Sequence, residues 1–171
     1  MIILLYIFTD CDSKINDKSI WPCPHNDRLK YIYIDKPDDK YTHLSLFDIY
    51  SFTHISHGMI LFILLNYIYG KKNVNMVFIT IGWGILWEII ENTYYDKFRI
   101  DTKYQRNYYG DSIINSVGDI LCCFIGFSIA WMLPNKKYSI LLIILNEIFL
   151  YMKMKSNLFT FFTQIFTQIF I

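Results

Sequence analysis

Ionisable side chains recur inside apolar stretches of this chain at helical spacing. His54 and His57 are three residues apart in "YSFTHISHGMILF", and Glu88 and Glu91 are three apart in "GWGILWEIIENT". Residues three or four apart share one face of a helix, so the side chains of each pair point the same way. Imidazole and carboxylate groups are ordinary ligands of divalent metals. We therefore predict that these four residues hold a divalent metal ion.

A third apolar stretch, "GDSIINSVGDILCCFIGFSIAWML", carries Asp111, Asn115 and Asp119 at intervals of four. A carboxylate in a membrane-spanning helix costs roughly 2.5 to 3.5 kcal/mol at the bilayer centre, so it usually faces a cavity or a partner. We predict that these three residues and Arg99, in the preceding loop, are catalytic residues that move protons and bind a phosphate group. The alternative for Asp119 is a structural hydrogen bond to His57 or Asn92.

The other charged groups also have structural alternatives. Asp111 is well placed to cap the helix that follows it. Glu88 or Glu91 can form an ion pair with Arg99 or Lys97. Small residues of the third stretch can allow two helices to approach closely. They are Ser112, Ser116, Gly118 and Gly126.

The composition of the chain indicates a membrane protein. Of its 171 residues, 54% are hydrophobic and only 18% are charged, whereas soluble domains have roughly 45 to 50% apolar residues. The formal net charge of +1 leaves no basic patch for nucleic acid, so membrane lipids are the predicted partners. The oligomeric state does not follow from the composition.

Three segments are long and apolar enough to span a bilayer, which takes about 20 residues. They are residues 50–69, 74–92 and 112–133. A fourth, residues 138–152, has fifteen residues and would span a locally thinned bilayer. The predicted fold is all-α, an integral membrane bundle of about four transmembrane helices.

Two very short loops, "GKKN" and "PNKK", make neighbouring helices antiparallel. The start of the first span, the end of the second and the start of the third then lie on one side of the membrane. Asn146 and Glu147, near the end of the fourth span, fall on that side too. The sequence therefore predicts one polar cluster near one membrane face.

Outside the bundle of residues 50–152 we expect two other regions. Residues 1–49 contain eight apolar residues, which form either an interfacial anchor or the stub of a longer helix, and a loop-rich extramembrane segment. Residues 153–171 place threonine and glutamine on one helical face and phenylalanine opposite, as in an interfacial amphipathic helix. The orientation and the identity of the membrane stay open.

Several of these motifs resemble a known family. "YSFTHISHGMILF", "LWEIIENT", "KFRIDT", "YYGDSIINSVGD" and "GFSIAWMLP" are similar, in order and spacing, to uncharacterised protein family 0314, also called domain of unknown function 2585. The resemblance covers about residues 11–160 and extends through "NEIFLYMKMKSNL". It implies a multi-pass membrane protein without assigning a reaction.

A fainter similarity is to the VanZ-like proteins. They combine a histidine, a glutamate and an arginine followed by an Asp-x-x-x-Asn-x-x-Gly pattern. The corresponding positions here are His57, Glu88 and Arg99, with the pattern beginning at Asp111. This resemblance implies a role at cell-envelope lipids or in glycopeptide resistance.

Two functions of different classes follow from these observations. In the first, the protein is a membrane-embedded, metal-assisted enzyme that acts on a lipid head group. In the second, the polar cluster belongs to a non-catalytic membrane protein, as a structural network or a binding site for an ion, a lipid or a partner.

Overall fold

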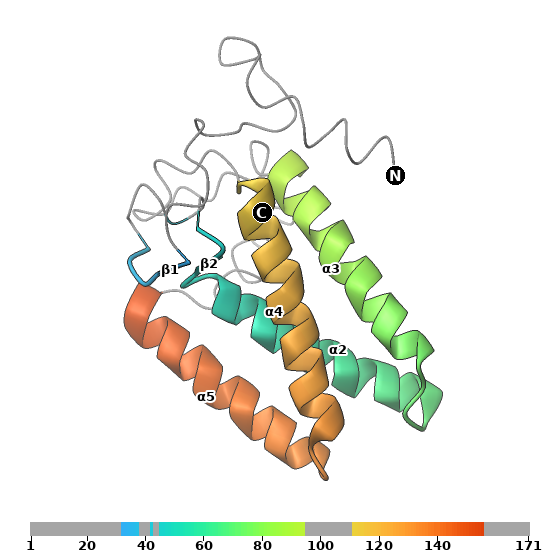
Figure 1. The fold of residues 1–171 in the computed structure, drawn as a ribbon. Helices are drawn as coiled ribbons and strands as arrows, with labels where there is room; N and C mark the ends of the chain where they lie inside the picture. The colour runs from blue at the N-terminus through green and yellow to red at the C-terminus, as the bar shows by residue number, and fades with distance from the viewer. Residues whose placement is uncertain (1–31, 38–41, 43–44, 95–110, 156–171) are drawn as a thin grey trace, which may run out of the picture.

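The computed structural model describes residues 32–37, 42, 45–94 and 111–155. Four helices make up most of this part (Figure 1): α2 (Ser51–Tyr69), α3 (Asn75–Tyr94), α4 (Ile113–Met132) and α5 (Lys136–Met154). Two short strands, β1 (Tyr33–Ile34) and β2 (Phe47–Asp48), pair in parallel just before α2. The all-α fold class is confirmed for the described residues.

The helices follow the predicted segments closely, except that α5 is longer than the apolar stretch that marked it. The side chain of Asn135 accepts the N–H of Lys137, which caps the helix at its N-terminus. The two lysines therefore lie inside the first turn of α5. Its 19 residues correspond to a length of about 28 Å.

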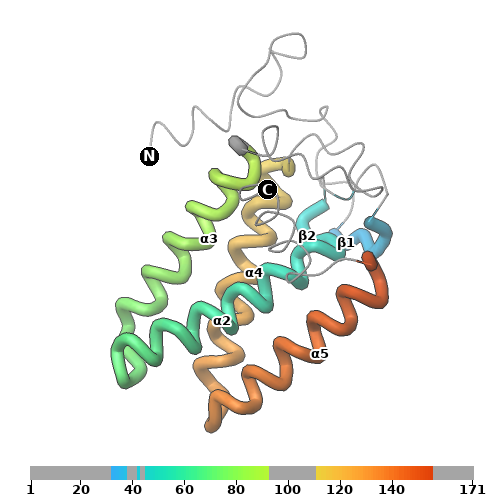
Figure 2. Tube along the Cα trace, turned by 180° about the vertical axis from the view of Figure 1, so that it is seen from behind, coloured from blue at the N-terminus to red at the C-terminus, as the bar shows by residue number. Residues whose placement is uncertain are grey.

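Two of the helices, α2 and α4, are long and apolar enough to cross a membrane, with mean hydropathy values of 1.3 and 1.9. They cross each other in the middle of the bundle, and α3 and α5 lie on either side of the crossing (Figures 1 and 2). The crossing therefore holds the bundle together.

Glycines let the backbones of α2 and α4 touch at this crossing. A Cβ atom added at Gly58 would lie 1.8 Å from the carbonyl oxygen of Cys123. One added at Gly126 would lie 2.0 Å from the carbonyl oxygen of Ile55. Because backbone cannot move aside as a side chain can, only glycine fits at both positions. The predicted close approach at Gly126 is confirmed.

The crossing separates an apolar end of the bundle from a polar end. At the apolar end, Met59, Phe62, Met76 and Phe127 form a buried cluster, in which the rings of Phe62 and Phe127 meet edge to face at 5.7 Å. At the other end, the buried side chains include carboxylates, amides, hydroxyls and an imidazole, beside a small apolar cluster of Ile49, Leu150 and Met154.

Candidate metal centre

The polar end is formed where the first turns of α2 and α4 meet the last turns of α3 (Figure 1). This is the convergence that the alternating helix directions predict. It brings together His54 of α2, Glu88 of α3 and Asp119 of α4, whose exposed fractions are 5%, 3% and 3%. These three residues are called the triad below.

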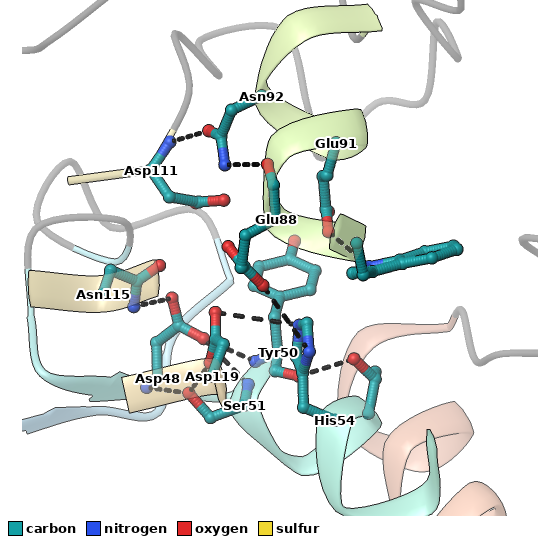
Figure 3. A network of polar contacts seen from close by, with 12 residues as sticks. Asp48, Tyr50, Ser51, His54, Glu88, Glu91, Asn92, Asp111, Asn115 and Asp119 are labelled. Atoms are coloured by element: carbon teal, nitrogen blue, oxygen red, sulfur yellow. Dashed lines mark hydrogen bonds and ion pairs between the residues drawn. The ribbon is translucent and has the colours of Figure 1, made fainter. Parts of the chain in front are cut away.

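The imidazole of His54 lies between the two carboxylates of the triad (Figure 3). Its Nδ1 is 3.7 Å from Glu88 Oε1, and its Nε2 is 3.7 Å from Asp119 Oδ2. One ligand atom from each residue lies within 4.8 Å of the others. Two atoms that bind one metal at about 2.1 Å are roughly 3 to 4.2 Å apart, so the distance from either nitrogen of His54 to its own carboxylate suits ligation of a cation. An imidazole binds one metal through one nitrogen, so the other carboxylate would have to approach from within 4.8 Å to complete the site.

The carboxylate of Glu88 is buried without a hydrogen bond. Neither of its oxygens has a hydrogen-bond partner, and its ion pair within the described residues is with His54. Asp48 and Asp111 are also almost completely buried nearby. A buried carboxylate without such partners is costly unless a proton or a cation neutralises it. The donor set of the triad therefore fits a divalent metal ion.

A second group of polar residues surrounds Asp119. The hydroxyl of Ser51 donates to Asp119 Oδ1 at 2.5 Å and accepts the N–H of Asp48 at 3.0 Å. Asp48 Oδ1 accepts the N–H groups of Tyr50 and Ser51 at 2.7 and 3.1 Å. This exchange between Asp48 and Ser51 is a reciprocal cap of the N-terminus of α2.

Asn115 ties this group to the chain before α2. Its Nδ2 donates to Asp48 Oδ2 at 3.2 Å and to the carbonyl oxygen of Ser45 at 3.0 Å (Figure 3). Gly118 allows the same segment to lie against α4, because a Cβ atom there would be 1.7 Å from the carbonyl oxygen of Leu46. Asn115 thus links α4 to this segment through its Nδ2, and its catalytic role stays a prediction.

The two other predicted ligands lie beside the triad. Glu91 Oε2 accepts a hydrogen bond of 2.8 Å from the indole N–H of Trp87. The ring of His57 packs edge to face against His54 and Trp87, at centroid distances of 5.4 and 5.0 Å. His57 Nε2 is buried without a hydrogen-bond partner. The structure therefore places His57 next to the triad and Glu91 one helical turn from Glu88.

Two structural alternatives take a different form in the folded chain. Asp111 does not cap α4, because the side chain of Ser112 accepts the N–H of Asn115 at 3.2 Å. Asp111 instead donates its own N–H to Asn92 Oδ1 at 2.7 Å. The hydrogen-bond donor to Asp119 is a serine and not His57, because the first turn of α2 faces α4 with Ser51.

Arg99, the fourth predicted catalytic residue, lies outside the described residues. In the fourth helix, Asn146 does not join the triad. Its Nδ2 donates to the carbonyl oxygen of Phe52 at 2.7 Å and to the hydroxyl of Ser56 at 2.9 Å. Asn146 thus docks α5 against α2.

Sequence reasoning missed Asp48 and Ser51. Both lie at the edge of the polar N-terminal segment, where a carboxylate and a hydroxyl are expected to be solvated. The pattern Asp-x-x-Ser before an apolar helix is a capping signal that could have marked them. It does not predict that Ser51 reaches Asp119, which is 68 residues away in the sequence.

An apolar recess of about 270 Å³ borders this network. Asp48 and Ser51 form part of its wall, and the rest comes from side chains of the strands, α2 and α4. They are Tyr33, Phe47, Phe52, Ile55, Cys122 and Ile125. Burial raises the pKa of the Tyr33 hydroxyl, and the nearby carboxylates of Asp35 and Asp48 raise it further.

Residues 30–166 match a family profile described as "Protein of unknown function (DUF2585)". The chain belongs to this family. Every residue of the triad and of the network around Asp119 lies within the matched range. The resemblance to uncharacterised protein family 0314 is therefore confirmed, whereas the similarity to the VanZ-like proteins stays a prediction.

Curated relatives carry the name "UPF0314 protein". The relative from Brucella anthropi is 36% identical over 92 residues, which are 52% of this chain and 46% of that protein. The one from Sphingopyxis alaskensis is 39% identical over 83 residues, or 47% and 44% of the two chains. The match spans less than half the length of each of these relatives. No solved structure matches the chain significantly.

Proposed function

We propose that this protein is a multi-pass integral membrane protein that uses a divalent metal at the triad to act on a lipid head group. The observation that carries the proposal is the approach of one imidazole and two carboxylates, from three helices, to within 4.8 Å in a buried position.

The outer surface of the bundle supports a place in the membrane. Large apolar side chains are exposed along α3 and α5, on the faces that point away from the crossing. Examples are Phe78, Trp83, Leu86, Leu141, Leu145 and Ile148. Soluble monomers rarely expose contiguous apolar patches larger than a few hundred Å². Lipid is a solvent in which such a surface is stable, and four helices satisfy their backbone hydrogen bonds internally there.

The position of the triad within the bundle supports a head group as the substrate. Asp119 lies in the second turn of α4 and Glu88 in the last turns of α3, so the triad is close to one end of the helices. In a membrane this end would lie near the level of the head groups. The apolar recess beside Ser51 offers room for part of an alkyl chain.

Within this proposal His54, Glu88 and Asp119 are the metal ligands, so Asp119 takes a role for which the sequence suggested His57 and Glu91. A divalent metal there would polarise a phosphoryl or carbonyl oxygen, or lower the pKa of a bound water. Asp111 and Arg99 keep their predicted roles in proton transfer and phosphate binding as part of the proposal.

Metal content tests the proposal directly. The full chain, purified in detergent, is equilibrated with Zn²⁺ or Mn²⁺, desalted and analysed for bound metal. We expect about one ion per chain in the wild type and a loss of most of it in Glu88→Gln and Asp119→Asn. Glu91→Gln is the matched control, because it removes the same charge from the same helix outside the triad.

Activity is tested with the metal-loaded protein and vesicles of phosphatidylethanolamine and phosphatidylglycerol. Mass spectrometry should detect head-group release or transfer that disappears in Asp119→Asn and persists in Glu91→Gln. A wild-type protein without stoichiometric metal would overturn the proposal. Bound metal with no change in any lipid would limit the protein to ion binding.

The alternative function, a non-catalytic structural network, is favoured by one specific observation. The Nδ2 of Asn115 and the carboxylate of Asp48 bond to one another and to nearby backbone groups, as residues that stabilise a fold do. The Oδ1 of Asn115 is buried without a hydrogen-bond partner. Under this alternative, the triad would share protons instead of a metal, and the metal analysis would be negative.

A further inference from the structure

The hydroxyl of Ser51 has a fixed direction. It accepts the backbone N–H of Asp48 at 3.0 Å, and its single proton is directed to Asp119 Oδ1 at 2.5 Å. A serine hydroxyl has one donor and two acceptor positions, so these two contacts determine which way its proton points. Ser51 is 2% exposed, which leaves it little contact with solvent.

This contact divides the two oxygens of Asp119 between different partners. Oδ1 accepts the hydrogen bond from Ser51, whereas Oδ2 faces His54 Nε2 at 3.7 Å (Figure 3). The oxygen that faces His54 is therefore the one that has no hydrogen bond to Ser51. A carboxylate held in this way presents a single oxygen to a cation.

Asp48 keeps Ser51 in place. Its carboxylate caps the first turn of α2 through the N–H groups of Tyr50 and Ser51. Asn115 of α4 holds the other oxygen of Asp48 at 3.2 Å. Hydrogen bonds therefore run from Asn115 through Asp48 and Ser51 to Asp119. This series begins and ends on α4 and passes through the start of α2, so it links the two crossing helices.

We infer that Ser51 is a positioning residue that holds Asp119 for ligation of the metal through Oδ2 alone, with Asp48 fixing the direction of the Ser51 hydroxyl. This inference rests on the proposed metal centre. Residues that orient metal ligands in this way commonly change metal affinity by about 10- to 100-fold when they are replaced.

The test compares Ser51→Ala with Ser51→Thr and with Ser56→Ala in the full chain in detergent. Ser56 is the matched control, because it is another buried serine of α2 whose hydroxyl bonds to Asn146 and not to the triad. Affinity for Co²⁺ is measured by titration, and the visible absorption of bound Co²⁺ reports the ligand arrangement.

We expect Ser51→Ala to bind Co²⁺ about 10- to 100-fold more weakly and with an altered absorption spectrum. Ser51→Thr keeps the hydroxyl and should restore most of the affinity, and Ser56→Ala should bind as the wild type does. Wild-type affinity and spectrum in a folded Ser51→Ala would overturn the role of Ser51 and leave the metal centre standing. A wild type that binds no Co²⁺, Zn²⁺ or Mn²⁺ would overturn both.

A second measurement decides the question if Ser51→Ala does not fold. Infrared difference spectra of the wild type with and without metal, and of Asp119→Asn, identify the carboxylate bands of Asp119. One-oxygen ligation widens the separation of the two carboxylate stretching bands relative to the free ion, whereas ligation through both oxygens narrows it. A narrowed separation for Asp119 would overturn the inference.

Discussion

Two carboxylates of the polar end, Asp48 and Glu88, are equally buried but differ in what surrounds them. Asp48 accepts hydrogen bonds from two backbone N–H groups and from Asn115. Glu88 accepts no hydrogen bond of normal geometry, and its ion-pair partner among the described residues is His54, at 3.7 Å. A buried carboxylate whose oxygens accept hydrogen bonds stabilises the fold. A buried carboxylate that accepts none is costly until a cation or a proton neutralises it. The comparison separates the part of the network that builds the fold from the part that can bind a metal.

The largest effect on stability is expected at Asn115. Asn115→Leu removes the amide donor to Asp48 Oδ2 and to the carbonyl oxygen of Ser45. Loss of one neutral and one charged hydrogen bond in a buried position should lower the free energy of unfolding by about 2 to 4 kcal/mol. Thermal or denaturant unfolding in detergent measures this change.

Asn66→Leu is the control for that variant, because Asn66 lies on α2 at the other end of the bundle and makes no side-chain hydrogen bond in the described part of the chain. It should change stability much less. Equal losses in the two variants would contradict a structural role that is specific to Asn115.

The next effect comes from metal at the triad. A metal at 100 times its dissociation constant should raise the free energy of unfolding by about 2.7 kcal/mol, because it binds the folded chain only. Thermal unfolding with Zn²⁺ and then with excess EDTA measures the gain and its reversal. Asp119→Asn should show no gain, and a gain as large as in the wild type would place the metal elsewhere.

A smaller effect, opposite in sign to that of Asn115→Leu, is expected when Glu88 is replaced in the absence of metal. Glu88→Gln replaces a buried carboxyl group that has no hydrogen bond with an amide, at nearly constant volume. The free energy of unfolding of the metal-free protein should stay the same or rise by up to about 1 kcal/mol. A loss comparable to that of Asn115→Leu would show that Glu88 also builds the fold, which would remove the contrast drawn above.

An effect of similar size is expected beside the triad. Trp87→Phe removes the indole donor to Glu91 Oε2 and keeps an aromatic ring against His57. One hydrogen bond at a half-buried position is worth about 0.5 to 1.5 kcal/mol. Unfolding should reveal a loss of this size, and metal content should remain that of the wild type. Reduced metal content in Trp87→Phe would show that Glu91 takes part in metal binding.

The helices and their convergence could be predicted from the sequence because hydrophobic length and short loops are local properties. Residues 50–69, 74–92 and 112–133 correspond closely to α2, α3 and α4, and the fourth segment corresponds to α5. Antiparallel neighbours then place His54, Glu88 and Asp119 at one end of the bundle without any knowledge of their contacts. The division into an N-terminal segment, a bundle and a tail stays a prediction, since most of both end regions lies outside the described residues.

The choice of partners within that end could not be predicted, because it depends on how α2 rotates and crosses α4. Gly58 and Gly126 allow backbone contact at the crossing, and that contact sets which side of each helix faces the other. This rotation of α2 directs Ser51 to Asp119 and leaves the ring of His57 packed against Trp87. Helical spacing cannot distinguish His54 from His57, since the two share one face.

By itself, the sequence determined which segments are helices, which ends of them meet and which residue types gather there, because these follow from periodicity and chain direction. Only the tertiary structure decided that three of the predicted groups form the triad, that Asn115 bonds to Asp48, and that Ser51 bonds to Asp119. The physical reason is that a hydrogen bond or a shared ligand requires atoms to meet within a few tenths of an ångström. That precision arises from the packing of one helix on another and not from the spacing of residues along either of them.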